Sequence, residues 1–106
     1  MIETDTMDLQ ALEASAGEAS DLLKALSNPH RLLILCQLEG GERQVSQLQT
    51  GSGLSQSALS QHLARLREDG LVAARREGTA VFYSITNPAA LKVIGVLAEI
   101  FCPPSS

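Results

Sequence analysis

The stretch that decides the fold is residues 54–71, LSQSALSQHLARLREDGL. Ser55 is a good helix N-cap, because its hydroxyl can accept a hydrogen bond from the backbone of the first turn. Gly70 stands where a left-handed residue ends a helix, and Leu71 can fold back on Leu66 in a Schellman motif. The sequence therefore specifies a helix between these two ends by local signals alone.

This helix has two faces of different character. Its leucines share one side, where they can pack on a core, and the opposite side is polar. A surface helix usually carries more Glu and Lys than this one, which has neither before Glu68. Small hydroxyls, an amide and an alanine let a helix approach base edges in the major groove, so we expect DNA contact here, with Arg65 and Arg67 reaching phosphates. The polar face consists of Ser57, Ser60, Gln61, Ala64 and Arg67.

The next segment, LVAARREGTAVFYSI at 71–85, predicts two short strands around a Glu-Gly-Thr turn. Arg75 and Arg76 lie beside this turn, where they can contact phosphates or the minor groove, or simply form a solvated strand end. Two helices joined by a tight glycine-containing turn and followed by a basic hairpin are typical of a winged helix-turn-helix.

The remaining segments predict further helices. Residues 8–26 repeat apolar residues at helical spacing. Asn28-Pro29 and Asn87-Pro88 each combine a cap with a first-turn proline, so a helix is expected to begin at each. The helix from Pro29 to the glycine pair at 40–41 is apolar nearly all the way round and should be buried. A short third helix should end at the glycines 51 and 53.

The predicted fold class is mainly α with a small β-hairpin, a winged helix-turn-helix in the order α-α-α-α-β-β-α. The chain of 106 residues, 44% of them apolar, suffices for a single domain over 1–106. We assign its parts as an N-terminal dimerisation helix (1–26), a helix-turn-helix (44–68), a wing (71–86) and a C-terminal dimerisation helix (87–102).

The net charge of −4 is unevenly distributed. Residues 1–24 hold six acids against one lysine, whereas residues 43–76 hold five arginines against two acids. The middle of the chain is therefore a basic segment, as a DNA-binding surface requires. The acidic N-terminus has no secretory signal and no apolar run is long enough for a membrane span, so we expect a cytoplasmic protein.

The last helix also predicts a homodimer. Its apolar residues cover more than half of its circumference, which is too wide an arc for one small domain to bury. A twofold dimer would place two reading helices about 34 Å apart on a pseudo-palindromic operator in double-stranded DNA. The apolar residues are Val93, Ile94, Val96, Leu97, Ala98, Ile100 and Phe101.

Three segments resemble the ArsR-type winged-helix repressors of bacteria: LKALSNPHRLLILCQL, GLSQSALSQHLARLREDGLV and RREGTAVFYSI. The resemblance covers about residues 20–102 and implies a homodimeric repressor that leaves its operator when an inducer binds. It also implies that Arg75 to Phe82 form the wing. The glycine-rich QTGSG at 49–53 departs from the family pattern. The residues that the resemblance places on the DNA-reading helix are Ser55, Gln56, Ser57, Ser60, Gln61 and His62.

Neither a metal site nor a catalytic site is expected. Many members of this family sense metals, but residues 42–50 have no Cys, His or Asp, and the last helix has only Glu99 as a carboxylate and no His. A borderline-soft cation needs a set of three or four such ligands. His62 is better explained by packing or a phosphate contact than by catalysis. We therefore expect no enzyme activity and no cofactor.

Cys36 and Cys102 leave two interpretations open. By chemistry alone they are inert packing, since the C-terminal end of a helix disfavours a thiolate. In the BigR- and HlyU-like branch of the family, which this chain resembles, two such thiols are the sensor. That resemblance implies that a persulfide or an oxidant bridges them and the repressor releases DNA. The alternatives are a repressor with structural cysteines and another inducer, or a winged helix that contacts only protein.

Overall fold

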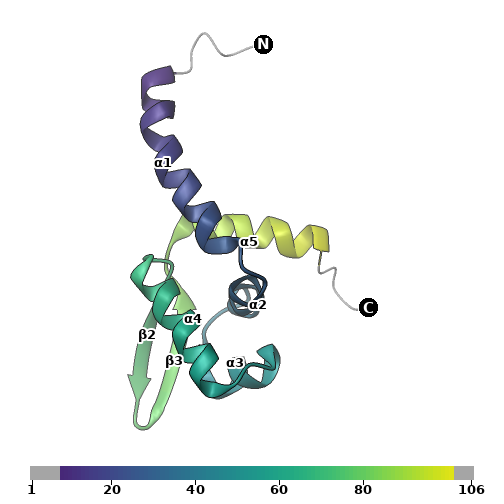
Figure 1. Ribbon diagram of the computed structural model, residues 1–106. Coiled ribbons are helices and arrows are strands. Elements are labelled where there is room, and N and C mark those ends of the chain that lie inside the picture. Colours follow the sequence, from purple (N-terminus) through teal and green to yellow (C-terminus); the bar gives the residue numbers. More distant parts are fainter. Residues whose placement is uncertain (1–7, 102–106) are drawn as a thin grey trace.

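The computed structural model describes residues 8–101, a helical body with a small sheet at one side (Figure 1). The strands form one antiparallel sheet in the order β1-β3-β2. A mainly helical winged helix with a β-hairpin, predicted from the sequence, is confirmed. In chain order the elements are α1 (Leu9–Leu26), α2 (Pro29–Leu38), β1 (Arg43–Gln44), α3 (Val45–Ser52), α4 (Gln56–Glu68), β2 (Val72–Glu77), β3 (Ala80–Ile85) and α5 (Pro88–Phe101).

Both ends of α4 are formed as the sequence predicts. The hydroxyl of Ser55 accepts a hydrogen bond from the backbone N–H of Ala58 at 3.2 Å. At the other end Gly70 has a φ of 74°, and the N–H of Leu71 donates to the carbonyl of Leu66 at 3.0 Å. This bond is the long-range one of a Schellman motif, and it turns the chain from α4 into β2.

The predicted starts of α2 and α5 are also confirmed. The side chains of Asn28 and Asn87 accept hydrogen bonds from first-turn N–H groups, and Pro29 and Pro88 are the first helical residues. The predicted end of α2 is wrong by a short distance, because the helix stops at Leu38 before the glycine pair.

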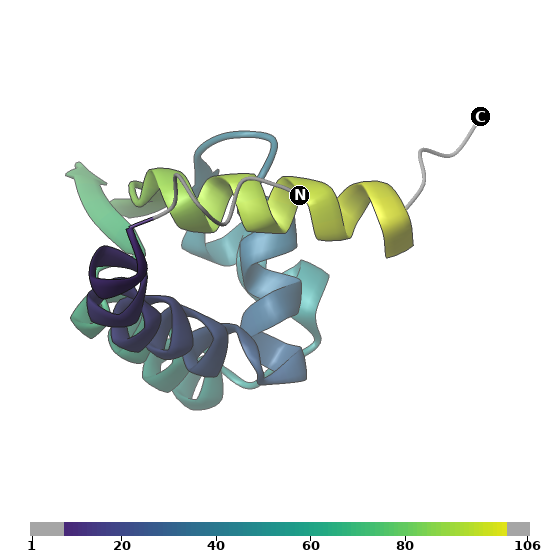
Figure 2. The same ribbon diagram turned by 90° about the horizontal axis from the view of Figure 1, so that it is seen from above.

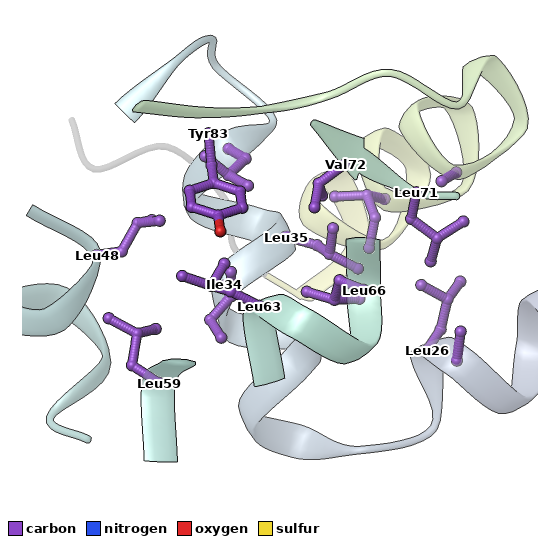
Figure 3. Close-up of a cluster of buried hydrophobic side chains, with 14 residues drawn as sticks. Leu26, Ile34, Leu35, Leu48, Leu59, Leu63, Leu66, Leu71, Val72 and Tyr83 are labelled. Atoms are coloured by element: carbon purple, nitrogen blue, oxygen red, sulfur yellow. The ribbon is translucent and has the colours of Figure 1, made fainter. Parts of the chain in front are cut away.

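The hydrophobic core lies between α2, α4 and the sheet (Figure 3). Leu59, Leu63 and Leu66 of α4 are at most 3% exposed and pack toward Ile34 and Leu35 of α2. Each fully buried leucine or isoleucine stabilises the fold by about 1.5–3 kcal/mol. The core thus anchors α4 by its apolar side and leaves the polar side outward.

Two expectations about α2 and α3 need correction. The wheel of α2 predicts burial on nearly all sides, but Leu33 is 42% exposed because neighbouring elements cover only part of the helix. The third helix does not end at its first glycine. It continues through Gly51 and is ended by Gly53, which has a φ of 70° in the left-handed region.

One strand was missed by the sequence reading. β1 is only two residues long, and it pairs Arg43 with Tyr83 and Gln44 with Phe82 on β3. Two residues carry no periodicity, so only their pairing across the fold defines them as a strand. The element order is therefore α-α-β-α-α-β-β-α, rather than the predicted order without a strand between the second and third helices.

The two terminal helices extend beyond this body. α1 rises away from it, and α5 lies across α2 with its C-terminal half projecting outward (Figures 1 and 2). Both helices leave large apolar side chains uncovered within the single chain. These exposed residues are Leu9, Leu12 and Leu23 of α1 and Leu91, Val96, Ile100 and Phe101 of α5.

Candidate nucleic-acid interface

The outer face of α4 is exposed, and its polar side chains are available for hydrogen bonds. Within residues 8–101, the side chains of Ser57, Ser60 and Gln61 make no hydrogen bond to the protein. Their donors and acceptors are therefore available to base edges, which is the way a helix reads sequence in the major groove. The exposed residues of this face are Gln56, Ser57, Ser60, Gln61, Ala64 and Arg67.

A groove of about 620 Å³ separates α4 from the hairpin. Arg67 lines it from α4, Arg76 and Thr79 from the hairpin, and Ser46 from the first turn of α3. Neither Ser46 nor Thr79 was singled out by sequence reasoning. A serine in the first turn of the helix before the reading helix, and a threonine in the hairpin turn, are the signals that would have found them.

Arg67 is held in place beside this groove. Its Nη1 donates to the hydroxyl of Tyr83 at 3.5 Å, and Tyr83 itself is only 7% exposed. A guanidinium has five N–H donors, so one bond to Tyr83 leaves the others for a phosphate. This arrangement directs Arg67 toward the groove rather than into bulk solvent.

The two arginines of the hairpin differ sharply. Arg75 makes a bidentate ion pair with Glu42 at 2.8 and 2.9 Å and a third bond to Glu77 at 2.9 Å. The hydrogen bond to Glu42 is the main reason that the pKa of Arg75 is raised, and the same bond lowers the pKa of Glu42. Arg76, in contrast, has no ion pair within the described part of the chain.

The outer face of α4 lies within a segment that known proteins share. Residues 28–74 match the family described as bacterial regulatory protein, arsR family. The regulator YgaV of Escherichia coli is 46% identical over 97 residues, which span 91% of this chain and 98% of YgaV. The transcriptional activator HlyU of Vibrio cholerae is 46% identical over 96 residues, 91% of this chain and 89% of HlyU.

Solved structures agree with these sequence matches. Reduced HlyU of Vibrio cholerae has a TM-score of 0.84 at 45% identity, covering 88% of this chain and 98% of that one. The transcriptional repressor BigR of Xylella fastidiosa has a TM-score of 0.82 at 40% identity, covering 92% and 100%. A homodimeric winged helix-turn-helix DNA-binding domain, Mb0332 of Mycobacterium bovis, has a TM-score of 0.71 at 33% identity, covering 92% and 89%.

This chain belongs to the ArsR family of bacterial regulatory proteins. It is a DNA-binding transcriptional regulator with the winged-helix fold, and the ArsR-type resemblance drawn from its sequence is confirmed. Its relatives are regulators, not enzymes.

Two predicted contact residues of this ArsR-family regulator are not among the residues that line the groove. The hydroxyl of Ser55 is used as the cap of α4. Arg65 pairs with Asp69 at 3.4 Å and lines a separate hollow on the side of α1. Its guanidinium is thus partly neutralised and separated from Arg67, although both lie in the last turn of one helix.

His62 is partly buried between α4 and α2. Its ring centroid lies 5.5 Å from that of His30, which follows the cap of α2. Desolvation is the main cause that lowers the pKa of His62, and the positive charges of His30 and Arg31 lower it further. The ring of His62 thus lies beside His30, at the edge of the outer face of α4.

Cys36 of the ArsR-family regulator is not among the residues that line the groove between α4 and the hairpin. Cys36 is partly buried on α2 and packs against the core, and Cys102 lies outside the described residues. Among residues 8–101, no group of three His, Cys, Asp or Glu side chains could hold a metal ion. Within that same range no helix is long and apolar enough to cross a membrane.

Proposed function

We propose that this protein is a homodimeric repressor that reads a pseudo-palindromic operator with α4 and holds the DNA backbone with its wing. The observation that carries the proposal is the outer face of α4, whose hydroxyl and amide groups make no hydrogen bond within the described residues. In this arrangement Ser57 and Gln61 read bases, while Arg67 and Arg76 contact phosphates from the two sides of the groove. Gln56 and Ser60 complete the reading face.

The apolar surfaces of α1 and α5 support the dimer. Leu23 is 61% exposed, Ile100 61% and Phe101 73%, and apolar patches of this kind mark interfaces. Association of two copies through these helices would bury the patches and repeat the reading helix by a twofold axis. Two copies of α4 about 34 Å apart would then meet successive major grooves. Light scattering is expected to show a dimer at micromolar concentration, and a monomer would contradict it.

We also propose that a bridge between Cys36 and Cys102 lowers the affinity for the operator. α2 packs in the core and against α5, the helix that leads directly to Cys102. To form a disulfide, the two thiols lose two protons and two electrons to an oxidant. With a persulfide donor, one cysteine takes up the outer sulfur as the donor's thiol leaves, and the other cysteine closes a trisulfide while a second persulfide accepts the two electrons and leaves as thiol and sulfide. Either link would join α2 of the core to α5, the proposed dimer helix. A change in the separation of the two reading helices worth about 1–3 kcal/mol suffices to move operator occupancy several-fold.

The test of the switch compares the wild type with Cys36→Ser and Cys102→Ser. DNA affinity and intact mass are measured before and after treatment with a persulfide donor. The wild type is expected to gain the mass of a bridge and lose affinity, while each single variant keeps its affinity. If either variant loses DNA as the wild type does, the cysteines are structural and another inducer acts.

A gel shift at two salt concentrations tests whether the protein binds DNA through phosphate contacts. The operator is recovered by sequencing DNA that co-purifies with the protein from a bacterial cytoplasm, where we place the regulator. Because phosphate contacts release counterions, specific binding should weaken steeply as salt rises. A protein that retains no DNA, and shifts none at low salt, would instead use its winged helix only for protein contact.

A further inference from the structure

The side chain of Arg75 reaches from β2 across β3 to Glu42, the residue before β1. Arg75 on β2 pairs with Phe82 on β3, and Phe82 also pairs with Gln44 on β1. The guanidinium carbon of Arg75 lies over the ring of Phe82, 4.6 Å from its centroid. From there Nε and Nη2 reach both carboxylate oxygens of Glu42, which precedes β1.

Glu42 belongs to a segment that is tied to the core helix α2. Arg43, the next residue, donates through Nε to the backbone carbonyl of Gln37 at 3.2 Å, near the C-terminal end of α2. The contact from Arg75 to Glu42 therefore joins the outer strand of the wing to a loop that is fixed on α2. The hairpin turn lies further along the hairpin than this contact between Arg75 and Glu42.

The charges at the wing are already balanced around Arg75. Its Nε, Nη1 and Nη2 each donate to a carboxylate oxygen, so one cation faces the two anions Glu42 and Glu77. A DNA phosphate would have to compete with both carboxylates for this guanidinium. Arg75 and Arg76 both line the groove, but Arg76 has no ion pair in the described range and meets no such competition.

We propose that Arg75 is a positioning residue of the wing, which acts through Glu42 and Phe82 and does not itself bind a phosphate. It fixes the hairpin relative to α2, so that Arg76 and Thr79 meet the DNA backbone while α4 contacts bases in the major groove of the DNA. This role rests on the proposed docking of α4 and the wing on DNA. It gives Arg75 and Arg76 different functions, although the two arginines are adjacent in the sequence.

The test is a double-mutant cycle on operator affinity with Glu42→Gln, Arg75→Gln and the double variant. Glu42→Gln is expected to weaken binding by about threefold or more although it removes a negative charge near DNA, and the double variant should lose no more than either single one. Arg75→Lys keeps the charge but cannot make the bidentate contact, so it should behave like Arg75→Gln.

The salt dependence supplies a readout that a loss of packing alone would not change. Arg75→Gln and Arg75→Lys should keep the wild-type slope of log affinity against log salt, whereas Arg76→Gln should reduce it by about one. Circular dichroism checks that every variant is folded, as expected for exposed side chains.

Two results would overturn the proposal in distinguishable ways. If Glu42→Gln tightens binding and Arg75→Gln lowers the slope by about one, Arg75 is a phosphate contact and only the positioning role is wrong. If Arg76→Gln also leaves affinity and slope unchanged, the wing does not meet DNA. In that case the proposed docking fails together with the role of Arg75.

Discussion

The reading helix α4 and the hairpin lie on either side of one groove, yet they use their polar groups differently. Ser57, Ser60 and Gln61 on α4 make no hydrogen bond within the described chain, whereas Arg75 on β2 is bound to two carboxylates and an aromatic ring. A surface that must adapt to base edges keeps its donors and acceptors open. A surface that must hold its position uses them internally.

The basic segment at residues 43–76 offers fewer unpaired arginines to DNA than its sequence suggests. Five arginines between residues 43 and 76 suggest a broad basic surface. In the structure Arg65 faces Asp69, and Arg75 faces Glu42 and Glu77. Arg67 and Arg76 are the arginines of this segment that line the groove without an ion pair in the described residues.

The largest effect is expected on the buried side of α4. Leu66 is fully buried, so Leu66→Ala should lower the free energy of unfolding by about 2–5 kcal/mol through lost burial and a cavity. Ser60→Ala on the exposed side is the matched control and should change stability by about 0.5 kcal/mol or less. Urea unfolding followed by circular dichroism measures both, and equal losses would mean that the two faces of α4 are misassigned.

The second effect concerns sequence discrimination. Gln61→Ala should relax the preference at one base pair by about 1–3 kcal/mol, because a side-chain amide can make two hydrogen bonds to a base edge. Affinities for the operator and for single-substitution operators give this value. Gln10→Ala on α1, outside the groove, should leave every preference unchanged, and the reverse pattern would place the reading face elsewhere.

A smaller effect, uniform over all sequences, is expected on the wing. Arg76→Ala should weaken binding to operator and unrelated DNA alike and reduce the salt slope by about one. Arg65→Ala serves as its control, since Arg65 pairs with Asp69 on the side of α1. A reduced slope for Arg65→Ala would show that phosphates reach around the end of α4, and the contrast between the two arginines would be lost.

The smallest effect is the pH dependence of His62. Burial and the nearby positive charges lower its pKa in the folded state below 6.5. The unfolded chain therefore binds this proton more readily, and stability should fall as the pH drops from 6.5 through the folded-state pKa. The denaturant concentration at the unfolding midpoint, measured at pH values on both sides of 6.5, should decline less steeply with falling pH in His62→Gln than in the wild type. An unchanged slope would mean that the ring is not desolvated against α2.

Local signals allowed most of the fold to be predicted from the sequence. Ser55 and Gly70 define α4 by their own hydrogen bonds and backbone conformation, and Asn28 and Asn87 do the same for the starts of α2 and α5. β1 could not be found this way, because its two residues become a strand only by pairing with β3.

Local sequence patterns also allowed part of the candidate site to be predicted. Helical periodicity alone separates the reading face of α4 from its buried face. The state of Arg75 depends on Glu42, which lies 33 residues away in the chain, and no local pattern reveals that contact. Periodicity does place Arg65 and Arg67 on different sides of α4, because residues two apart do not share a helix face, but it does not show that Arg65 lines a hollow beside α1.

The most direct test of the account is an amide chemical-shift titration of the labelled protein with its operator duplex. The largest changes are expected on the outer face of α4 and at residues 76–79 of the wing, with smaller ones at the start of α3. Residues of α1 and α5 should shift little, since we propose that these helices form the dimer and not the DNA surface. Changes concentrated on α1 and α5, with the amides of α4 unmoved, would contradict the assignment of α4 as the helix that reads DNA.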